Sequence, residues 1–169
     1  IVAHQLTIKS PVFPNFASKI NQNYLAAFDQ IWVPDFEKIE ESLAGELSHN
    51  ENLKTKLHYI GPLSHLNFVE SKVAPEKIKC LAILSGPEPQ RSIFEKEICT
   101  VLEALKVPST VVRGSSDTSV LNFEFIRVVD RASAQEIKTL INSAEIIVCR
   151  SGYSTLMDLF VMNAKTIIL

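Results

Sequence analysis

Two short stretches of this sequence hold most of the residues that could do chemistry, and each directly follows an apolar run. The first is Ser85-Gly86-Pro87-Glu88-Pro89-Gln90, after Cys80–Leu84, and the second is Arg150-Ser151-Gly152-Tyr153-Ser154, after Ile146–Cys149. In both, a serine and a glycine stand where a strand would give way to a helix. Unpaired backbone amides at a helix start attract anions and polar ligands, so the sequence indicates two turns that could bind such a ligand.

Asp158 adds a carboxylate to the second stretch. It follows Ser151 by seven residues, two helical turns later, so its side chain should lie near the same edge of a helix that Ser151 caps. A carboxylate there could accept hydrogen bonds from sugar hydroxyls, and Arg150 could contact a phosphate. The alternatives are a solvated carboxylate or surface ion pair at Asp158, and an arginine at Arg150 that pairs with a neighbouring acid. His4 is a candidate general base, with a structural histidine as the alternative.

Strands and helices alternate through the part of the chain that contains both stretches. Apolar runs predict strands over 78–85, 110–113, 123–129, 146–149 and 166–169. The spacing of apolar residues predicts helices over 90–106, 133–141 and 151–162. Ser133 and Glu136 have capping-box spacing. The alternation predicts a parallel, doubly wound sheet, in which ligands bind at the carboxyl ends of the strands.

The helix over 90–106 is predicted to face inward through a set of apolar residues. These are Ile93, Ile98, Val101, Leu102 and Leu105. Arg91, early in the same helix, is expected to be exposed to solvent.

The first third of the chain has a different pattern. A helix over 15–30 and a strand over 31–34 precede a charged segment, 36–47, that is also expected to be helical. We expect residues 1–58 to be the end of one domain with a connecting segment, and 59–169 to be a nucleotide-sugar-binding domain that is incomplete at its end. The sequence does not begin with Met and ends within an expected strand, so we expect it to be a piece of a longer protein.

Composition and charge limit the kinds of partner and location that are expected for the protein. The 169 residues are 46% hydrophobic and carry a net charge of −2, and no basic face stands free of acidic neighbours, so nucleic acid is not an expected partner. Three cysteines without paired spacing favour reduced, buried thiols in a cytoplasmic protein rather than a zinc site or disulfides. No signal peptide and no apolar run of about 18 to 20 residues is present, so the chain is expected to be soluble.

The two stretches fit one ligand better than they fit separate ligands. A nucleotide whose phosphates lie over the first turn and whose ribose reaches Asp158 would span both, and a nucleoside-diphosphate sugar has this shape. Pro87 and Pro89 each remove an amide donor, so the first turn is neither a dinucleotide fingerprint nor a Walker loop. A hydrolase elbow is not favoured, because Ser151 lacks the preceding glycine and no histidine follows it.

The stretch Cys149–Leu159 resembles the Arg-Ser-Gly motif in the C-terminal domain of GT-B glycosyltransferases related to the N-acetylglucosaminyltransferase of peptidoglycan synthesis. The resemblance implies that Asp158, in place of the usual Glu, holds the ribose hydroxyls of UDP and that Ser85-Gly86 belongs to the diphosphate loop. Pro87-Glu88-Pro89 replaces the small residues usual in that loop. Tyr59–Pro62 is similar to the segment that enters the C-terminal domain. The stretches His4-Gln5 and Phe28–Pro34 look like the end of the N-terminal domain in predicted bacterial glycosyltransferases.

This resemblance implies a Rossmann-like doubly wound parallel sheet, the truncated C-terminal domain of a GT-B enzyme with a remnant of its N-terminal domain. It implies a hexosyltransferase that is inverting and metal-independent, uses a UDP-sugar as donor substrate with no cofactor, and acts on an unidentified acceptor. The implied site residues are His4 for catalysis and, for the nucleotide, Ser85, Gly86, Gln90, Arg150, Ser151, Gly152, Tyr153, Ser154 and Asp158.

Parts outside this chain would supply most of the acceptor site and any peripheral membrane association, so the chain alone is expected to be inactive. The catalytic base is either His4 or a residue of those parts. The alternatives are a sugar-nucleotide epimerase or hydrolase on the same fold, and a nucleotide-binding or interaction domain without turnover.

Overall fold

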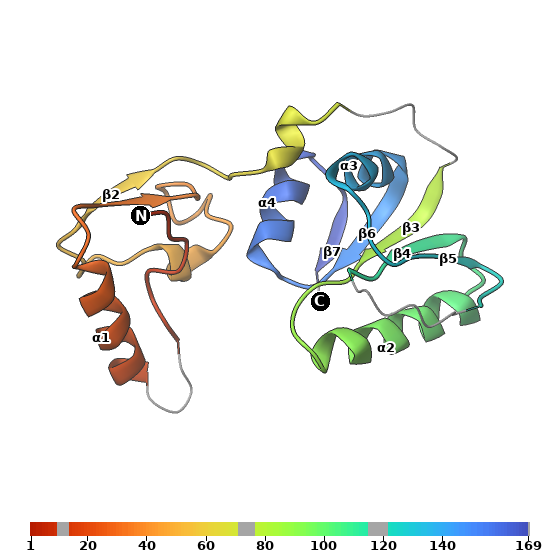
Figure 1. Cartoon of the computed structure of the whole chain (residues 1–169), viewed down its shortest axis with the longest axis horizontal. Coiled ribbons are helices and arrows are strands. Elements are labelled where there is room, and N and C mark those ends of the chain that lie inside the picture. Colours follow the sequence, from red (N-terminus) through yellow and green to blue (C-terminus); the bar gives the residue numbers. More distant parts are fainter. Residues whose placement is uncertain (10–13, 71–76, 115–121, 169) are drawn as a thin grey trace. The chain divides into compact units, whose positions relative to one another are not determined.

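A computed structural model describes residues 1–9, 14–70, 77–114 and 122–168, which form two compact units, Ile1–Leu63 and Ser64–Leu169 (Figure 1). The division falls a few residues after the boundary expected at Tyr59. The strand that ends at Tyr59 pairs within the first unit.

The first unit is built on a pair of parallel strands. Its elements are α1 (Pro14–Leu25), β1 (Gln30–Val33), the 3-10 helix η1 (Gly45–Ser48) and β2 (Lys56–Tyr59). β1 and β2 are parallel, with Ile31 opposite Leu57, and Val2 forms an isolated bridge to Trp32. Alternate residues of β1, Ile31 and Val33, are buried, which is typical of a strand with one covered face.

The predicted helix over 36–47 is wrong, because a buried carboxylate takes up the backbone amides of this segment. Turns lead instead into η1, around Asp35, which is fully buried. Five groups donate to its carboxylate: the amides of Phe36 (2.8 Å), Leu43 (2.9 Å) and Ala44 (3.1 Å) and the hydroxyls of Ser42 (2.6 Å) and Ser48 (2.7 Å). Burial alone would raise the pKa of Asp35, but these hydrogen bonds outweigh it and lower the pKa to about 2.

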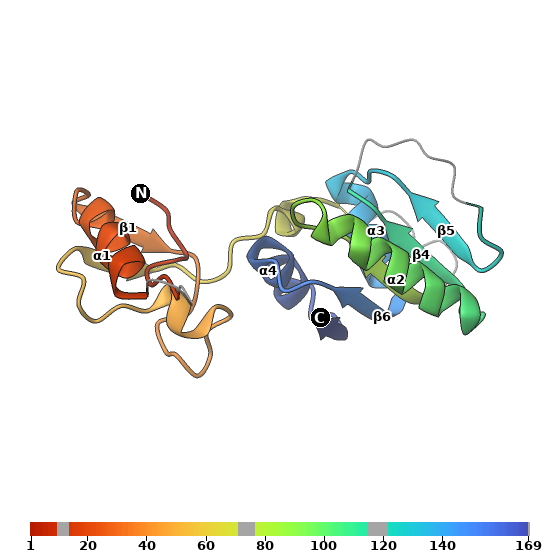
Figure 2. The same cartoon turned by 90° about the horizontal axis from the view of Figure 1, so that it is seen from below.

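The second unit contains a five-stranded sheet in the order β5-β4-β3-β6-β7, with every neighbouring pair parallel. The strands are β3 (Ile78–Ile83), β4 (Ser109–Val112), β5 (Ile126–Val129), β6 (Ala144–Cys149) and β7 (Thr166–Ile168). The helices are the 3-10 helix η2 (His65–Phe68) and α2 (Gln90–Ala104), α3 (Ala134–Ser143) and α4 (Tyr153–Val161). α2 packs on one face of the sheet, in front of the strands in Figure 2, and Leu140, Ile141 and Leu159 of α3 and α4 belong to the apolar layer on the other face. The predicted fold class, an α/β Rossmann-like doubly wound parallel sheet, is confirmed.

Two apolar layers cover the two faces of this sheet. Ala82 and Leu84 pack with Ile98 and Leu102 of α2, while Leu81, from the opposite face of β3, belongs to the layer under α3 and α4. The predicted inner face of α2 is only partly right. Ile93, Val101 and Leu105 are more than half exposed, because the helix turns Glu95, Ile98, Cys99 and Leu102 inward instead.

The capping box predicted at Ser133 and Glu136 is confirmed at the start of α3. Ser133 is the N-cap of the helix and its hydroxyl accepts a hydrogen bond from the Glu136 amide. No helix in the described part of the chain has both the length and the apolar character needed to cross a lipid bilayer.

Candidate functional site

The two turns that the sequence singled out contact each other at one edge of the sheet. The β3–α2 turn (residues 84–89) and the β6–α4 turn (residues 150–152) follow strands that are parallel neighbours, with Ile83 opposite Cys149. The Ser85 hydroxyl oxygen lies 3.3 Å from the position of a Cβ at Gly152, and Nη1 of Arg150 donates to the Ser85 carbonyl at 3.4 Å. One ligand could therefore contact both turns.

Arg150 lies across the β3–α2 turn. Gly86 has φ of +100°, a conformation that L side chains rarely adopt, and a Cβ there would lie 2.6 Å from Nη1 of Arg150. Only a residue without a side chain permits both this backbone conformation and this close approach. The arrangement brings a guanidinium, which is positively charged and carries several N–H donors, to the turn expected to hold a diphosphate.

The start of α4 has no side-chain cap. The N-cap residue is Gly152, with φ of −68° and ψ of 125°, so the prediction that Ser151 caps the helix is wrong. Ser151 lies before the N-cap and is exposed, as is Ser154 within the first turn, while Tyr153 is half-buried. The positive end of α4 is therefore not neutralised by a side-chain cap, and two hydroxyl groups are exposed beside it.

The start of α2 already holds a carboxylate. Glu88 accepts hydrogen bonds from the amide and hydroxyl of Ser92, at 3.3 and 2.6 Å, and pairs with Arg91. The hydroxyl of Ser92, together with Arg91, lowers the pKa of Glu88, which keeps it ionised. Gln90, the first residue of α2, is exposed at the same helix end. The Ser85-Gly86 part of the turn is therefore better suited to an anion than the start of α2.

Asp158 lies on α4 beside a small cavity. Its Oδ1 accepts a hydrogen bond from the Ser64 hydroxyl at 2.5 Å. The cavity measures about 190 Å³, and its wall is mostly apolar, formed by residues that include Leu66, Ile83, Ala132, Ile137, Thr155 and Leu159. The carboxylate thus lies at the edge of an apolar space at the carboxyl end of β3.

Sequence reasoning missed a group of four charged side chains next to the β3–α2 turn, of which Arg91, Glu95 and Arg113 are largely buried and Asp130 is exposed. Arg113 Nε lies 2.6 Å from Glu95 Oε1, and Nη1 of Arg113 donates to Asp130 at 3.1 Å. Arg91 was expected to be exposed, but its side chain is only 13% exposed, and it donates to the Arg113 carbonyl at 3.1 Å. A useful signal was available: Glu95 stands among the apolar residues of its helix, four residues after Arg91.

These charged residues fix the beginning of α2 against the ends of β4 and β5. Burial alone would lower the pKa of Arg113, but Asp130 and Glu95 raise it. The guanidinium therefore stays charged and paired.

His4 lies in the first unit, on an exposed segment before α1. Burial lowers the pKa of its imidazole, and the charge of Asp35 opposes that shift. The neutral form that a general base requires is therefore favoured. Among the described residues, no group of three His, Cys, Asp or Glu side chains is placed to bind a metal ion.

Comparisons with known proteins find similarity only among solved structures. No family model matches the sequence, and no curated protein matches it. Among solved structures the chain is similar to spinosyn forosaminyltransferase SpnP, with a TM-score of 0.48 and 14% sequence identity. The similarity covers 83% of this chain and 36% of that one, so the chain spans about a third of the length of its structural neighbour.

Proposed function

We propose that the second unit is the donor-binding part of a glycosyltransferase that moves a hexose from a UDP-sugar to an acceptor. The observation that supports this most directly is the contact between the β3–α2 and β6–α4 turns, with Arg150 across Gly86 and Asp158 further along α4. A nucleoside diphosphate presents the matching groups in the same order: phosphates, a ribose and a base.

The diphosphate would lie over Ser85 and Gly86. Arg150 supplies a positive charge there, and the start of α4 adds the partial positive charge of a helix without a side-chain cap. The exposed hydroxyls of Ser151 and Ser154 supply further donors for phosphate oxygens. The negative charge of Glu88 would keep the phosphates away from the start of α2.

The ribose and base would occupy the region of Asp158. Ser64 engages Oδ1 of this residue, so Oδ2 is the oxygen that would accept hydrogen bonds from the ribose hydroxyls. The apolar cavity of about 190 Å³ is smaller than the roughly 300 to 1,000 Å³ of pockets that hold whole ligands. We therefore assign it to the base, whose flat ring suits apolar walls such as Leu66 and Ile137.

In the proposed reaction an acceptor hydroxyl attacks the anomeric carbon, the bond from that carbon to the diphosphate oxygen breaks, and the sugar configuration inverts. Arg150 and the amides of α4 would stabilise the negative charge that develops on the departing UDP, so the reaction we propose uses no metal ion. His4 is our candidate for the base that takes the acceptor proton. The acceptor itself is unidentified. The three cysteines are free and buried, which suits the cytoplasmic location that we propose.

Calorimetric titration of the chain with UDP tests the donor site. Wild-type protein should bind UDP, and Asp158→Ala should bind it at least about tenfold more weakly, since it loses hydrogen bonds between a charged carboxylate and the ribose. Asp29→Ala, which removes an exposed carboxylate from the first unit, is the matched control and should bind like the wild type. No binding by the wild-type chain would refute the donor site, and equal binding by Asp158→Ala would refute the role of this residue.

Incubation with a UDP-sugar separates transfer from the alternatives. A longer protein that contains this chain should release UDP only when an acceptor is added. Conversion of the free donor into another sugar nucleotide would identify an epimerase, and release of UDP without an acceptor would identify a hydrolase. Binding without any turnover would identify a nucleotide-binding domain.

A further inference from the structure

A buried serine contacts the carboxylate of the proposed ribose site. Ser64 is only 7% exposed, and its hydroxyl donates to Asp158 Oδ1 at 2.5 Å while it accepts from the Leu66 amide at 3.1 Å. An ionised carboxylate only accepts and an amide only donates, so both hydrogen bonds have a fixed direction. The single hydroxyl hydrogen of Ser64 therefore points at Asp158.

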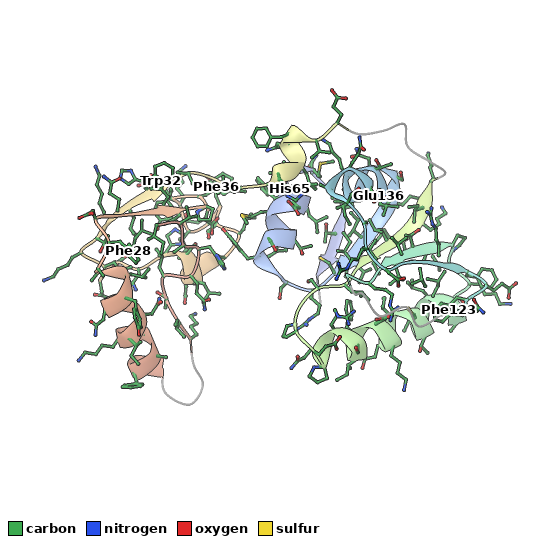
Figure 3. All side chains as sticks on the ribbon, viewed as in Figure 1. Phe28, Trp32, Phe36, His65, Phe123 and Glu136 are labelled. Carbon is green, nitrogen blue, oxygen red and sulfur yellow. The ribbon has the colours of Figure 1, made fainter. Side chains whose placement is uncertain are left out.

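The position of Ser64 is fixed independently of Asp158. It is the N-cap of η2, and the other end of this short helix is held by Lys138 of α3, whose Nζ donates to the carbonyls of Leu66 and Val69, both at 2.7 Å. Figure 3 shows His65, the first residue of η2, next to α4. Ser64 is thus a well-anchored group against which the Asp158 side chain can be oriented.

An aspartate on a helix has several rotamers, and only some of them would present an oxygen to a ribose. A hydrogen bond from a fixed neutral donor to one carboxylate oxygen selects a rotamer and leaves the charge in place. Within the described residues, the Ser64 hydroxyl donates the side-chain hydrogen bond that the Asp158 carboxylate accepts. The other oxygen then has a defined direction, which is the condition for binding two adjacent hydroxyls with good geometry.

We propose that Ser64 is a positioning residue for ribose recognition: it holds Asp158 in the rotamer that binds the 2′ and 3′ hydroxyls of a nucleoside diphosphate. This inference rests on the proposed function. The inference goes beyond the proposed function in one respect. Discrimination between a ribose and a deoxygenated sugar depends on Ser64, which lies 94 positions from Asp158 in the sequence and is held in place by η2 and Lys138.

Titration with UDP and with 2′,3′-dideoxy-UDP separates positioning from a merely structural role. Ser64→Ala should bind UDP about 5- to 20-fold more weakly than the wild type, whereas its affinity for dideoxy-UDP should change by less than about twofold. Ser64→Thr, which keeps the hydroxyl, should recover most of the affinity for UDP. In an Asp158→Ala background, Ser64→Ala should cause no further loss, because the effect acts through the carboxylate.

Ser143→Ala is the matched control, because Ser143 is a buried serine on α3 that donates to the Thr139 carbonyl and not to Asp158. It should bind UDP like the wild type. If Ser64→Ala does not fold, Ser64→Cys gives the same comparison, since a thiol is only a weak donor.

The inference would be overturned if Ser64→Ala bound UDP as the wild type does, or if it lost affinity for both ligands equally. Failure of the wild-type chain to bind UDP would instead overturn the proposed function, and this inference with it. The two failures are therefore distinguishable.

Discussion

Arg150 and Gly86 are in such close contact that a Cβ atom at Gly86 would lie 2.6 Å from Nη1 of Arg150. The two residues come from different turns, after β6 and after β3, and each constrains the other. The backbone at Gly86, with φ of +100°, brings the chain under the guanidinium, and the guanidinium fills the space that a side chain would need. Substitutions at either residue should therefore affect the same ligand.

Gly86→Ala should destabilise the second unit and weaken UDP binding. Alanine at this φ is strained by about 1 to 3 kcal/mol, and its methyl group would displace the end of the Arg150 side chain. Chemical denaturation followed by circular dichroism, together with calorimetry, measures the two effects. Gly152→Ala is the control for stability alone, because φ there is −68° and a Cβ would lie 3.3 Å from the Ser85 hydroxyl, a contact that a small shift relieves. Equal effects of the two substitutions on stability would contradict the account of Gly86.

Arg150→Met should weaken the binding of UDP much more than the binding of uridine. The guanidinium is placed beside the β3–α2 turn, where the diphosphate would lie, and uridine has no phosphate to contact it. We expect about a tenfold loss for UDP, the size of one charge-assisted interaction, and about twofold or less for uridine. Arg150→Lys should retain part of the affinity. A similar loss for both ligands would indicate that Arg150 only supports the turn.

The buried pair of Arg113 and Glu95 should show strong energetic coupling. Arg113→Met leaves the Glu95 carboxylate buried beside Arg91, whose Nη1 lies 3.8 Å away, and should cost about 3 to 5 kcal/mol of unfolding free energy. Removing both charges, with Glu95→Met added, should recover most of that loss, because the buried Glu95 carboxylate is then no longer left without Arg113. Thermal and chemical unfolding of the three variants measure the coupling. Losses that simply add would show that the two residues do not act as a pair.

Local patterns in the sequence were sufficient for the fold of the second unit. The apolar run at Cys80–Leu84 and the capping box at Ser133 and Glu136 each depend on residues that are neighbours in the chain, and both predictions are confirmed. The same local patterns placed the two turns after β3 and β6, which the parallel pairing brings to one edge. The contacts between these turns follow from the fold rather than from any motif.

Contacts between residues far apart in the sequence could not be predicted. Ser64 reaches Asp158 across 94 positions, and neither residue stands out locally as one member of a pair. The helix predicted over 36–47 is wrong for a similar reason, because the amides of Phe36, Leu43 and Ala44 donate to the carboxylate of Asp35, which lies before the segment. The exposed side of α2 was misassigned because the pairing of Glu95 with Arg113 was not foreseen.

Asp35 should make the stability of the first unit depend on pH. Its pKa is about 2 in the folded chain and near 3.8 when unfolded, so its stabilising contribution is complete above about pH 5 and is lost as the pH falls toward about 2. Asp35→Asn should cost about 2 to 4 kcal/mol near neutral pH, since an amide cannot accept all five hydrogen bonds. Urea unfolding followed by the fluorescence of Trp32, the single tryptophan, reports on this unit. The difference between wild type and variant should shrink steadily below about pH 4, and a difference that stayed constant to about pH 2 would show that the charge of Asp35 does not stabilise the loop.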